Sequence, residues 1–495
     1  MHTEDSHKEA LLETNRYLPN YRKLLFHNFT IIDENFACIP NQDVLVEDGK
    51  IKEISTTKTI AVDKKTRKEN KLASGIWFSP TDNLVVIEGK GKRVLSPGFV
   101  NAHCHVPMVL LRGYGENLNL HDWLYTRIFP YEEVMTTEDM YWGALLGITE
   151  MLACGVTSFS EMYMDIPVIA EAAYTAQIKC NICQPGNIKQ TEATLELVPQ
   201  LKAKLKAQNP EINYADASEL ITVDSGFHAV YTGTPEIVEV STGLAKKHNL
   251  QMQLHLSETA KENEDCQTEH GVSPAEFMVQ NGLFATRTTA AHCVHLSATD
   301  MTLLKEHNVF PCHCPSSNFK LGSGFADVKA WLEAGLTPCL GTDGAASNNN
   351  LNILEELHLA AMLAKGLHRD ATCLTTTELM RIATVNGAKA QGRLNTGLIK
   401  EGFEADLVVF DLDTPHTQPV FDPLANIIYS AQASNVRLTM VQGRVLYNKG
   451  KYFTLNPKQI IRKCLELKAE RQAQIAAQGG LPDSIEYSTN RNQAE

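Results

Sequence analysis

The chain has 495 residues, of which 43% are hydrophobic and 21% charged, and its formal net charge at pH 7 is −13. This composition is typical of a globular protein that can bury a large core. The negative charge argues against a nucleic acid or an anionic membrane as a partner. The sequence contains no run of about 18 apolar residues, so no membrane span is predicted. The polar N-terminus and the 12 Cys scattered through apolar segments favour a cytoplasmic protein with reduced thiols.

The N-terminal region predicts an arm followed by short strands. Residues 1–20 are polar and mixed in charge, which is typical of a loosely held arm. Short apolar runs predict strands at 24–26, 30–32, 43–46, 51–54 and 84–88. Asp48-Gly49 predicts a hairpin turn between two of them. Residues 56–83 are polar and rich in Lys without a clear period, and we interpret them as a surface insertion.

From residue 93 to about residue 392 the chain alternates between strand and helix patterns. Apolar runs predict eight strands at 99–100, 156–159, 180–183, 220–223, 252–254, 289–291, 308–310 and 338–340. Helical patterns fall between and after them at 138–153, 166–176, 193–207, 235–248, 274–281, 298–307, 328–334 and 353–365. Eight such units favour an α/β fold of the (β/α)8 TIM-barrel type. An open doubly wound sheet is the alternative, but no Gly-rich dinucleotide fingerprint follows any of these strands.

Strand patterns return after Gly402. They fall at 405–411, 436–441 and 444–447, with Gln442-Gly443 as a turn. We expect these strands to pair with the N-terminal ones in a small composite β-sandwich domain. The predicted division is an arm at 1–20, a composite β domain at 21–95 and 400–455, a barrel at 96–399, and a C-terminal helix and tail at 456–495.

The first barrel strand ends in Asn101-Ala102-His103-Cys104-His105. Side chains alternate along a strand, so His103 and His105 share one face and can hold one metal ion. Alone this motif is weak, because two polar surface residues also fit it. Later strand ends add further histidines and carboxylates: His228, His255, Glu258, His292, His295 and Asp343. The C-terminal strand ends carry the chemistry of a barrel, and buried imidazoles are costly unless they are paired or bind metal.

This order of residues resembles the amidohydrolase superfamily, with His-x-His, then His, His and Asp, and a composite β domain. Leu111-Arg112-Gly113-Tyr114, Asp122-Trp123-Leu124 and the run GTDGAASNN at 341–349 look like its S-adenosylhomocysteine/5′-methylthioadenosine deaminase branch. The run HCPSSN at 313–318 is shared more widely among aminohydrolases. The resemblance implies a hydrolytic deaminase that removes the 6-amino group of adenosine-type substrates (5′-methylthioadenosine, adenosine, S-adenosylhomocysteine) and releases ammonia.

The resemblance assigns a metal ion to His103, His105, His255 and Asp343. Three imidazoles and one carboxylate suit one divalent ion, Zn²⁺ first, with Fe²⁺ or Ni²⁺ as alternatives. No Lys ends the fourth strand, which argues against a carboxylated lysine that bridges two metals.

The catalytic residues carried over from the family are Glu258, His292 and Asp343. Asp343 is expected to act as general base, and His292 to polarise the attacking hydroxide. Glu258 is expected to protonate a ring nitrogen, which makes the ring carbon electrophilic. The substrate contacts implied by the resemblance are Trp123, Glu132, His228 and Glu258.

The chain departs from this branch at one place. Relatives often carry an Arg just after the third strand, where this chain has Cys183-Gln184-Pro185-Gly186-Asn187. We therefore expect a small neutral 5′ group to be preferred over a charged homocysteine tail. His295 and His313 are expected to satisfy internal hydrogen bonds rather than to bind metal.

Other functions stay open at this stage. One alternative is an aminohydrolase of another heterocycle, such as guanine, a pterin or an s-triazine. Another is a non-catalytic assembly protein on the same fold, against which the complete ligand set argues. The expected partner is a small-molecule substrate, and we expect a homo-oligomer, either a dimer or a tetramer.

Overall fold

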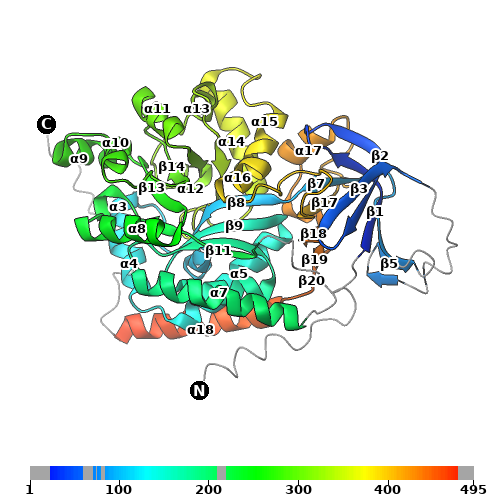
Figure 1. The fold of residues 1–495 in the computed structure, drawn as a ribbon, viewed down its shortest axis with the longest axis horizontal. Helices are drawn as coiled ribbons and strands as arrows, with labels where there is room; N and C mark the ends of the chain where they lie inside the picture. The colour runs from blue at the N-terminus through cyan, green and yellow to red at the C-terminus, as the bar shows by residue number, and fades with distance from the viewer. Residues whose placement is uncertain are drawn as a thin grey trace.

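The structure is a computed structural model of the chain, and it describes residues 23–58, 68, 71–73, 75–79, 84–208 and 219–477. A ring of parallel strands surrounded by helices lies beside a β domain that contains the N-terminal strands (Figure 1). The expected arm at 1–20 and the end of the expected tail lie outside the described residues.

The barrel wall consists of parallel strands that follow one another in sequence order. Their bounds are β8 (Phe99–Cys104), β9 (Val156–Met162), β10 (Lys179–Cys183), β11 (Ile221–Val223), β12 (Ser225–Phe227), β13 (Met252–Leu256), β14 (Thr288–His292), β15 (Val309–His313) and β16 (Cys339–Leu340). β11 and β12 are two halves of the fourth position, separated by Asp224. The expected (β/α)8 fold is thus confirmed.

The ring closes between its first and last strands through side-chain and backbone hydrogen bonds. The side-chain amide of Asn101 donates to Thr342 Oγ1 at 2.7 Å, and its oxygen accepts from the Thr342 N–H at 3.0 Å. The Asp343 N–H donates to the His103 carbonyl at 3.0 Å. Because of these bonds, the strand end that carries the His-x-His motif lies beside the one that carries Asp343.

Helices cover the outside of the barrel. Their bounds are α5 (Thr137–Ala153), α6 (Ile166–Ala176), α7 (Ile188–Gln208), α8 (Pro235–His248), α9 (Ala260–His270), α10 (Pro274–Gln280), α11 (Ala298–Glu306), α12 (Pro315–Lys320), α13 (Val328–Glu333) and α14 (Ile353–His368). The helices predicted at 166–176 and 235–248 have the predicted bounds. α9 was not predicted, because its buried residues are only Glu262 and Cys266, and so it lacks an apolar period.

Further short helices complete this part of the chain. The segment after β8 contains η1 (Val106–Leu111), α3 (Leu120–Trp123), η2 (Leu124–Ile128) and α4 (Phe129–Glu132). After α14 follow α15 (Thr376–Arg381), η4 (Ile382–Asn386), α16 (Gly387–Ala390), α17 (Pro423–Tyr429) and η5 (Ala433–Asn435); η3 (Val230–Thr232) follows β12. α18 (Pro457–Ala477) confirms the expected C-terminal helix and packs against α5, where Cys464 Sγ lies 3.4 Å from the Trp142 carbonyl oxygen.

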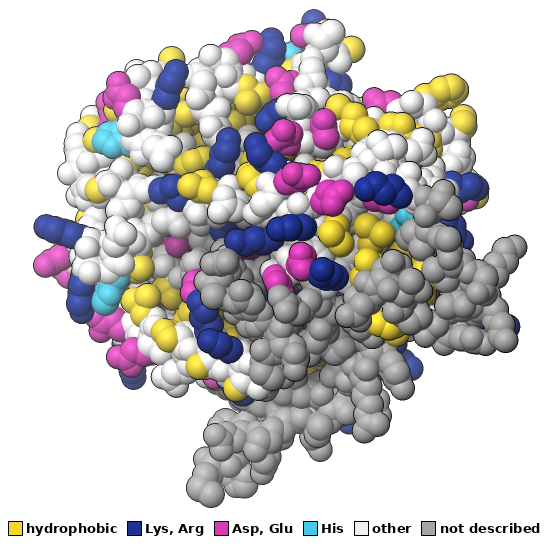
Figure 2. Space-filling view, turned by 45° about the vertical axis from the view of Figure 1, so that its right-hand side comes forward, with side chains coloured by type: hydrophobic (Ala, Val, Ile, Leu, Met, Phe, Trp, Pro, Cys, Tyr) yellow, Lys and Arg dark blue, Asp and Glu magenta, His cyan; other side chains and the backbone are white. Residues whose placement is uncertain are grey.

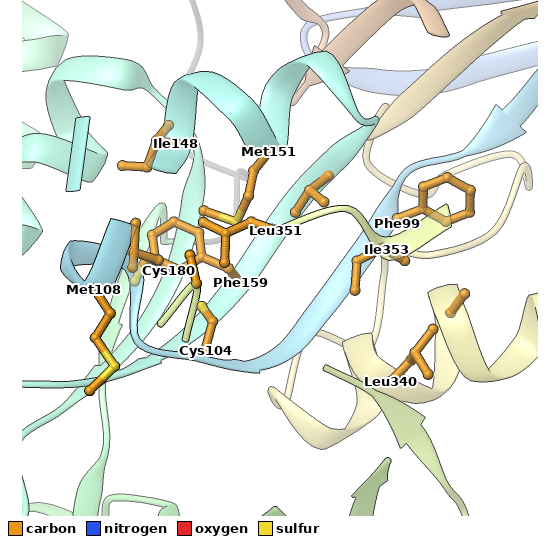
Figure 3. Close-up of a cluster of buried hydrophobic side chains, with 14 of the residues drawn as sticks. Phe99, Cys104, Met108, Ile148, Met151, Phe159, Cys180, Leu340, Leu351 and Ile353 are labelled. Atoms are coloured by element: carbon orange, nitrogen blue, oxygen red, sulfur yellow. The ribbon is translucent and has the colours of Figure 1, made fainter. Parts of the chain in front are cut away.

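Apolar side chains fill the space between the strands and the covering helices. Figure 3 shows Met151 of α5 close to Phe159 of β9, with Cys104 and Cys180 in the same cluster. Cys104 is fully buried, although it lies between two histidines in sequence. Its place in the core agrees with the alternation that puts His103 and His105 on the opposite face.

The strands at the two chain ends form one eleven-stranded sheet. Its strands are β1 (Lys23–Ile32), β2 (Cys38–Glu47), β3 (Lys50–Thr56), β4 (Lys71–Ala73), β5 (Ile76–Ser79), β6 (Leu84–Glu88), β7 (Arg93–Pro97), β17 (Leu407–Asp411), β18 (Val436–Val441), β19 (Arg444–Asn448) and β20 (Lys451–Tyr452). β7 pairs with β17, which joins N-terminal and C-terminal strands as expected. The boundaries of the domains stay a prediction.

Part of the stretch at 56–83 belongs to this sheet. β4 and β5 extend it beyond β6, and Ile76 and Trp77 of β5 are buried. The interpretation of the whole stretch as a surface insertion is therefore wrong for β5. Strands of three and four residues are too short to show a recognisable alternation in the sequence. Other residues of this stretch lie outside the described part of the chain.

The surface has mixed character. On the face shown in Figure 2, acidic and basic side chains are interspersed over the coloured part, with small hydrophobic areas between them. Within the described ranges, no helix is both long enough and apolar enough to cross a membrane.

A buried ion-pair cluster joins the barrel to the β domain. Lys179, at the start of β10, is completely buried, and its ammonium contacts the carboxylates of Glu404 and Asp406 just before β17. Asp406 also accepts from Thr396 Oγ1 at 2.8 Å and from the Gln442 N–H at 2.8 Å. The cluster therefore fixes the segment that leads from the barrel back to the sheet.

We predict that Lys179→Met lowers the free energy of unfolding by about 3–5 kcal/mol, because it removes the cation from two buried carboxylates. Lys202→Met is the control, since Lys202 forms an exposed pair with Glu219 and should change stability by only about 0–1 kcal/mol. Urea unfolding followed by circular dichroism measures both. Equal unfolding midpoints for the two variants would show that the cluster does not hold the domains together.

Candidate active site

Histidines and one aspartate from several strand ends meet at one end of the barrel. His103 and His105 come from the end of β8, His255 from β13, and Asp343 follows β16. His105 Nε2 lies 3.1 Å and His103 Nε2 3.5 Å from Asp343 Oδ1. The ring centroids of His103 and His255 are 4.9 Å apart. The structure thus brings together the four residues expected to bind metal.

The cluster contains two groups of three residues, and within each group all ligand atoms lie within 4.8 Å of one another. One group is His103, His105 and Asp343, and the other is His103, His255 and His292. His103 belongs to both groups and lies at the centre of the cluster. His292, expected to be catalytic, also lies close to His103, with the ring centroids 5.6 Å apart against 4.9 Å for His103 and His255.

The backbone is strained where these strands end. Ser257, His292, Cys293 and Asp343 have φ values of 49°, 70°, 50° and 59°, in the left-handed region. Residues other than Gly rarely adopt this conformation, and such outliers are concentrated at functional sites. The chain thus turns sharply after β13, β14 and β16, where His255, His292 and Asp343 lie.

Backbone carbonyls fix the orientation of the imidazoles. His255 Nδ1 lies 2.9 Å from the His228 carbonyl, and His105 Nδ1 contacts the Met162 carbonyl. A carbonyl only accepts, so Nδ1 carries the proton and Nε2 offers its lone pair to the cluster. His103 Nε2 is buried and has no hydrogen-bond partner. These donors fit a divalent metal ion.

The segment that follows β15 supports the cluster from the side. Asp343 Oδ2 accepts from Ser317 Oγ at 2.6 Å and from Ser347 Oγ at 2.8 Å. His292 Nδ1 lies 2.8 Å from Asn318 Oδ1. Ser317 and Asn318 belong to the HCPSSN run at 313–318, and no role was predicted for either of them. The signal was the position of this polar run immediately after a strand.

The pKa values in the cluster follow from burial and from Asp343. Burial lowers the pKa of His103 to about 4 and that of His255 well below its usual value, so both are neutral at pH 7. Neutral imidazole is the form that binds metal. Burial also lowers the pKa of His105, but the hydrogen bond to Asp343 outweighs burial and raises this pKa to about 9. Burial opposes ionisation of Asp343, but the neighbouring imidazoles of His103 and His105 hold its pKa well below the usual range.

A cavity of about 230 Å³ lies over this cluster. Trp123, Glu132, His228 and Glu258, which are the expected substrate contacts, all line it, together with His292 and Asp343. Trp123 and Glu132 belong to α3 and α4, in the segment after β8. Glu132 Oε1 accepts a hydrogen bond from the Tyr163 hydroxyl.

Glu258 is part of the cavity wall and lies beside His292. Its Oε1 accepts from Ser323 Oγ at 3.2 Å, and its Oε2 lies 3.7 Å from His292 Nε2. Burial raises the pKa of Glu258. A carboxyl with a raised pKa is suited to donate a proton at neutral pH. No sequence signal indicated Ser323.

His295 and His313, which were expected to satisfy internal hydrogen bonds, differ in the hydrogen bonds that they make. His295 Nε2 lies 2.7 Å from the Ser323 carbonyl, as expected for an internal hydrogen bond. His313 is buried, but its Nδ1 has no hydrogen-bond partner. The expectation of an internal hydrogen bond is therefore wrong for this nitrogen, because its ring packs edge-on against Trp331, with the ring centroids 6.1 Å apart.

Comparison with known proteins agrees with this geometry. The sequence profile described as "Amidohydrolase family" matches residues 94–446. A 5-methylthioadenosine/S-adenosylhomocysteine deaminase of Acetivibrio thermocellus is 40% identical over 376 residues, which is 76% of this chain and 86% of the relative. The protein of the same description from Pyrococcus furiosus is 36% identical over 446 residues, which is 90% of this chain and 100% of the relative.

A solved structure of an adenosine deaminase from Xanthomonas campestris with bound zinc has the same architecture. It superimposes with a TM-score of 0.79 at 28% identity, covering 92% of this chain and 100% of the other. The family, the fold and the class of enzyme expected from the sequence are confirmed. The chain is a member of the amidohydrolase family.

Proposed function

We propose that the chain is a Zn²⁺-dependent hydrolytic deaminase that replaces the 6-amino group of adenosine-type nucleosides with oxygen and releases ammonia. One observation carries this proposal: Glu258, a carboxyl with a raised pKa, faces the same cavity as the cluster of His103, His105, His255 and Asp343. The names of the relatives, which describe deaminases of 5-methylthioadenosine and S-adenosylhomocysteine, support the same chemistry.

His103, His105, His255 and Asp343 are the residues that would hold the metal. When bound, a divalent metal lowers the pKa of a water molecule and supplies hydroxide at neutral pH. The twelve cysteines are unpaired thiols, which agrees with a reducing compartment such as the cytoplasm. The expectation of a dimer or tetramer stays a prediction.

The roles of the chain's own residues follow from their contacts. Asp343 is ionised at neutral pH and can take the proton of the attacking water. Glu258 donates a proton to a ring nitrogen of the purine, which makes C6 electrophilic. His292 is held by Asn318 through Nδ1, so its Nε2 points towards Glu258 and the developing charge.

The cavity wall favours a neutral substrate tail. Apolar side chains form much of it, among them Met108, Leu124, Met162, Met164 and Leu321. Of the described residues that line it, none is Lys or Arg. Gln184, in the segment after the third strand that contains no Arg, also lines the cavity, and its Oε1 is buried without a hydrogen-bond partner. A neutral amide at this place cannot form the ion pair that an Arg would form with the carboxylate of a homocysteine tail.

The purified protein should contain close to one divalent metal ion per chain. His255→Ala should lose both metal and activity, because three remaining ligands bind more weakly. His270→Ala, which alters an exposed histidine on α9, should keep both. Elemental analysis and ammonia release measure these properties, and two metals per chain would refute the single-metal site.

Glu258→Gln should keep the metal but lower kcat by about 10²–10⁴-fold, because it preserves the shape and removes the proton donor. Ammonia release under saturating 5′-methylthioadenosine measures kcat, and elemental analysis confirms that the metal is retained. Turnover close to that of the wild type would show that Glu258 does not transfer the proton.

The kcat/KM for 5′-methylthioadenosine or adenosine should exceed that for S-adenosylhomocysteine, because none of the described residues that line the cavity is a Lys or Arg that could pair with the tail carboxylate. Gln184→Arg should raise kcat/KM for S-adenosylhomocysteine by roughly ten- to a hundredfold through a charge-assisted contact. Loss of adenine absorbance follows all three substrates. A wild-type preference for S-adenosylhomocysteine contradicts this assignment, and turnover of guanine or a triazine alone would leave only the reaction class.

A further inference from the structure

The first turn of helix α9 makes unusual hydrogen bonds. Several helices begin with a Ser or Thr followed three residues later by an acid whose carboxylate accepts from the backbone N–H of the first residue. These pairs are Thr136/Asp139 in α5, Ser273/Glu276 in α10, Ser297/Asp300 in α11 and Thr375/Glu378 in α15. Helix α9 has the same pattern in Thr259 and Glu262, and Thr259 Oγ1 accepts from the Glu262 N–H at 3.1 Å.

The Glu262 carboxylate, however, reaches further back along the chain. Its Oε1 accepts from the Ser257 N–H at 3.1 Å, and its Oε2 accepts from the Glu258 N–H at 2.8 Å. Both oxygens thus bind the chain just after β13 instead of the N–H of Thr259. Glu262 is only 3% exposed, so these bonds form away from solvent. An ordinary helix cap does not require this arrangement.

The bound peptide is the one that aims Glu258. Ser257 has a left-handed φ of 49°, which residues other than Gly rarely adopt, and its own Oγ is buried without a hydrogen-bond partner. The Ser257 carbonyl accepts from the His295 N–H at 3.0 Å. The two N–H groups held by Glu262 and this carbonyl are therefore the polar contacts that keep the turn in place.

We propose that Glu262 is the positioning residue of the deaminase, because it holds the turn at Ser257 and so aims the Glu258 carboxyl at the substrate ring. This inference rests on the proposed role of Glu258 as proton donor. With the turn held, Glu258 stands between Ser323 Oγ and His292 Nε2. If the turn relaxes, the carboxyl moves out of line with the ring nitrogen, although the metal ligands stay in place.

Glu262→Gln tests this proposal, because the variant keeps the size of the side chain but replaces one acceptor oxygen with a donor amide. We expect kcat for 5′-methylthioadenosine to fall by about ten- to a hundredfold, with little change in KM and with the metal content of the wild type. The control is Glu264→Gln, an exposed residue of the same helix, which should behave as the wild type. Unchanged kcat in Glu262→Gln overturns the proposal, and so does a loss of metal.

A double-mutant cycle separates positioning from a general structural role. If Glu262 acts through Glu258, adding Glu262→Gln to Glu258→Gln should not lower the residual activity further. A further loss of similar size in that background would mean that Glu262 supports the site by another route, and the proposal fails. If Glu258→Gln itself turns over like the wild type, the proposed role of Glu258 fails, which is a separate result.

Glu262→Asp provides a second variant if Glu262→Gln does not fold. It keeps the charge, but its shorter side chain cannot hold both N–H groups with the same geometry. We expect a kcat between those of Glu264→Gln and Glu258→Gln, again at constant metal content. A Glu262→Asp variant with wild-type kcat overturns the proposal.

Discussion

The site depends on one electrostatic constraint, which is the convergence of buried imidazole nitrogens on a buried carboxylate. The Nε2 atoms of His103 and His105 lie beside Asp343, the His255 ring packs against that of His103, and backbone carbonyls prevent the rings of His105 and His255 from turning away. Burial keeps His103 and His255 neutral, and His103 Nε2 has no partner within the protein. A divalent cation would satisfy these groups together, because it can accept a lone pair from each neutral imidazole and pair with the carboxylate.

The closed barrel makes this convergence possible. Two of the ligands stand on the first strand and one follows the last, so the site exists only where the ring closes. The bonds between Asn101 and Thr342 hold these strand ends together. Lys179 and its two carboxylates fix the segment that returns to the β domain, and no residue of this cluster lines the cavity. Stability and chemistry therefore rest on different groups of buried charges.

The sequence predicted what local patterns determine. Alternation along one strand placed His103 and His105 on one face, and apolar periods located helices such as those at 166–176 and 235–248. Contacts between segments that are far apart in the sequence could not be predicted from such local patterns. Ser317 and Asn318 of helix α12 contact Asp343 and His292, and the Glu262 carboxylate, in a helix without an apolar period, accepts from the N–H groups of Ser257 and Glu258. Short strands such as β5 were missed because they are paired by the rest of the sheet.

One metal ion is expected to be held by ligands from the first, fifth and eighth strands of the barrel. Anomalous scattering from crystals of the Zn²⁺-loaded protein, recorded on both sides of the zinc absorption edge, tests it most directly. We expect a single strong peak within bonding distance of Nε2 of His103, His105 and His255 and of a carboxylate oxygen of Asp343. A second peak of equal height in the cavity, or a single peak bound by His292 in place of His255, would contradict it.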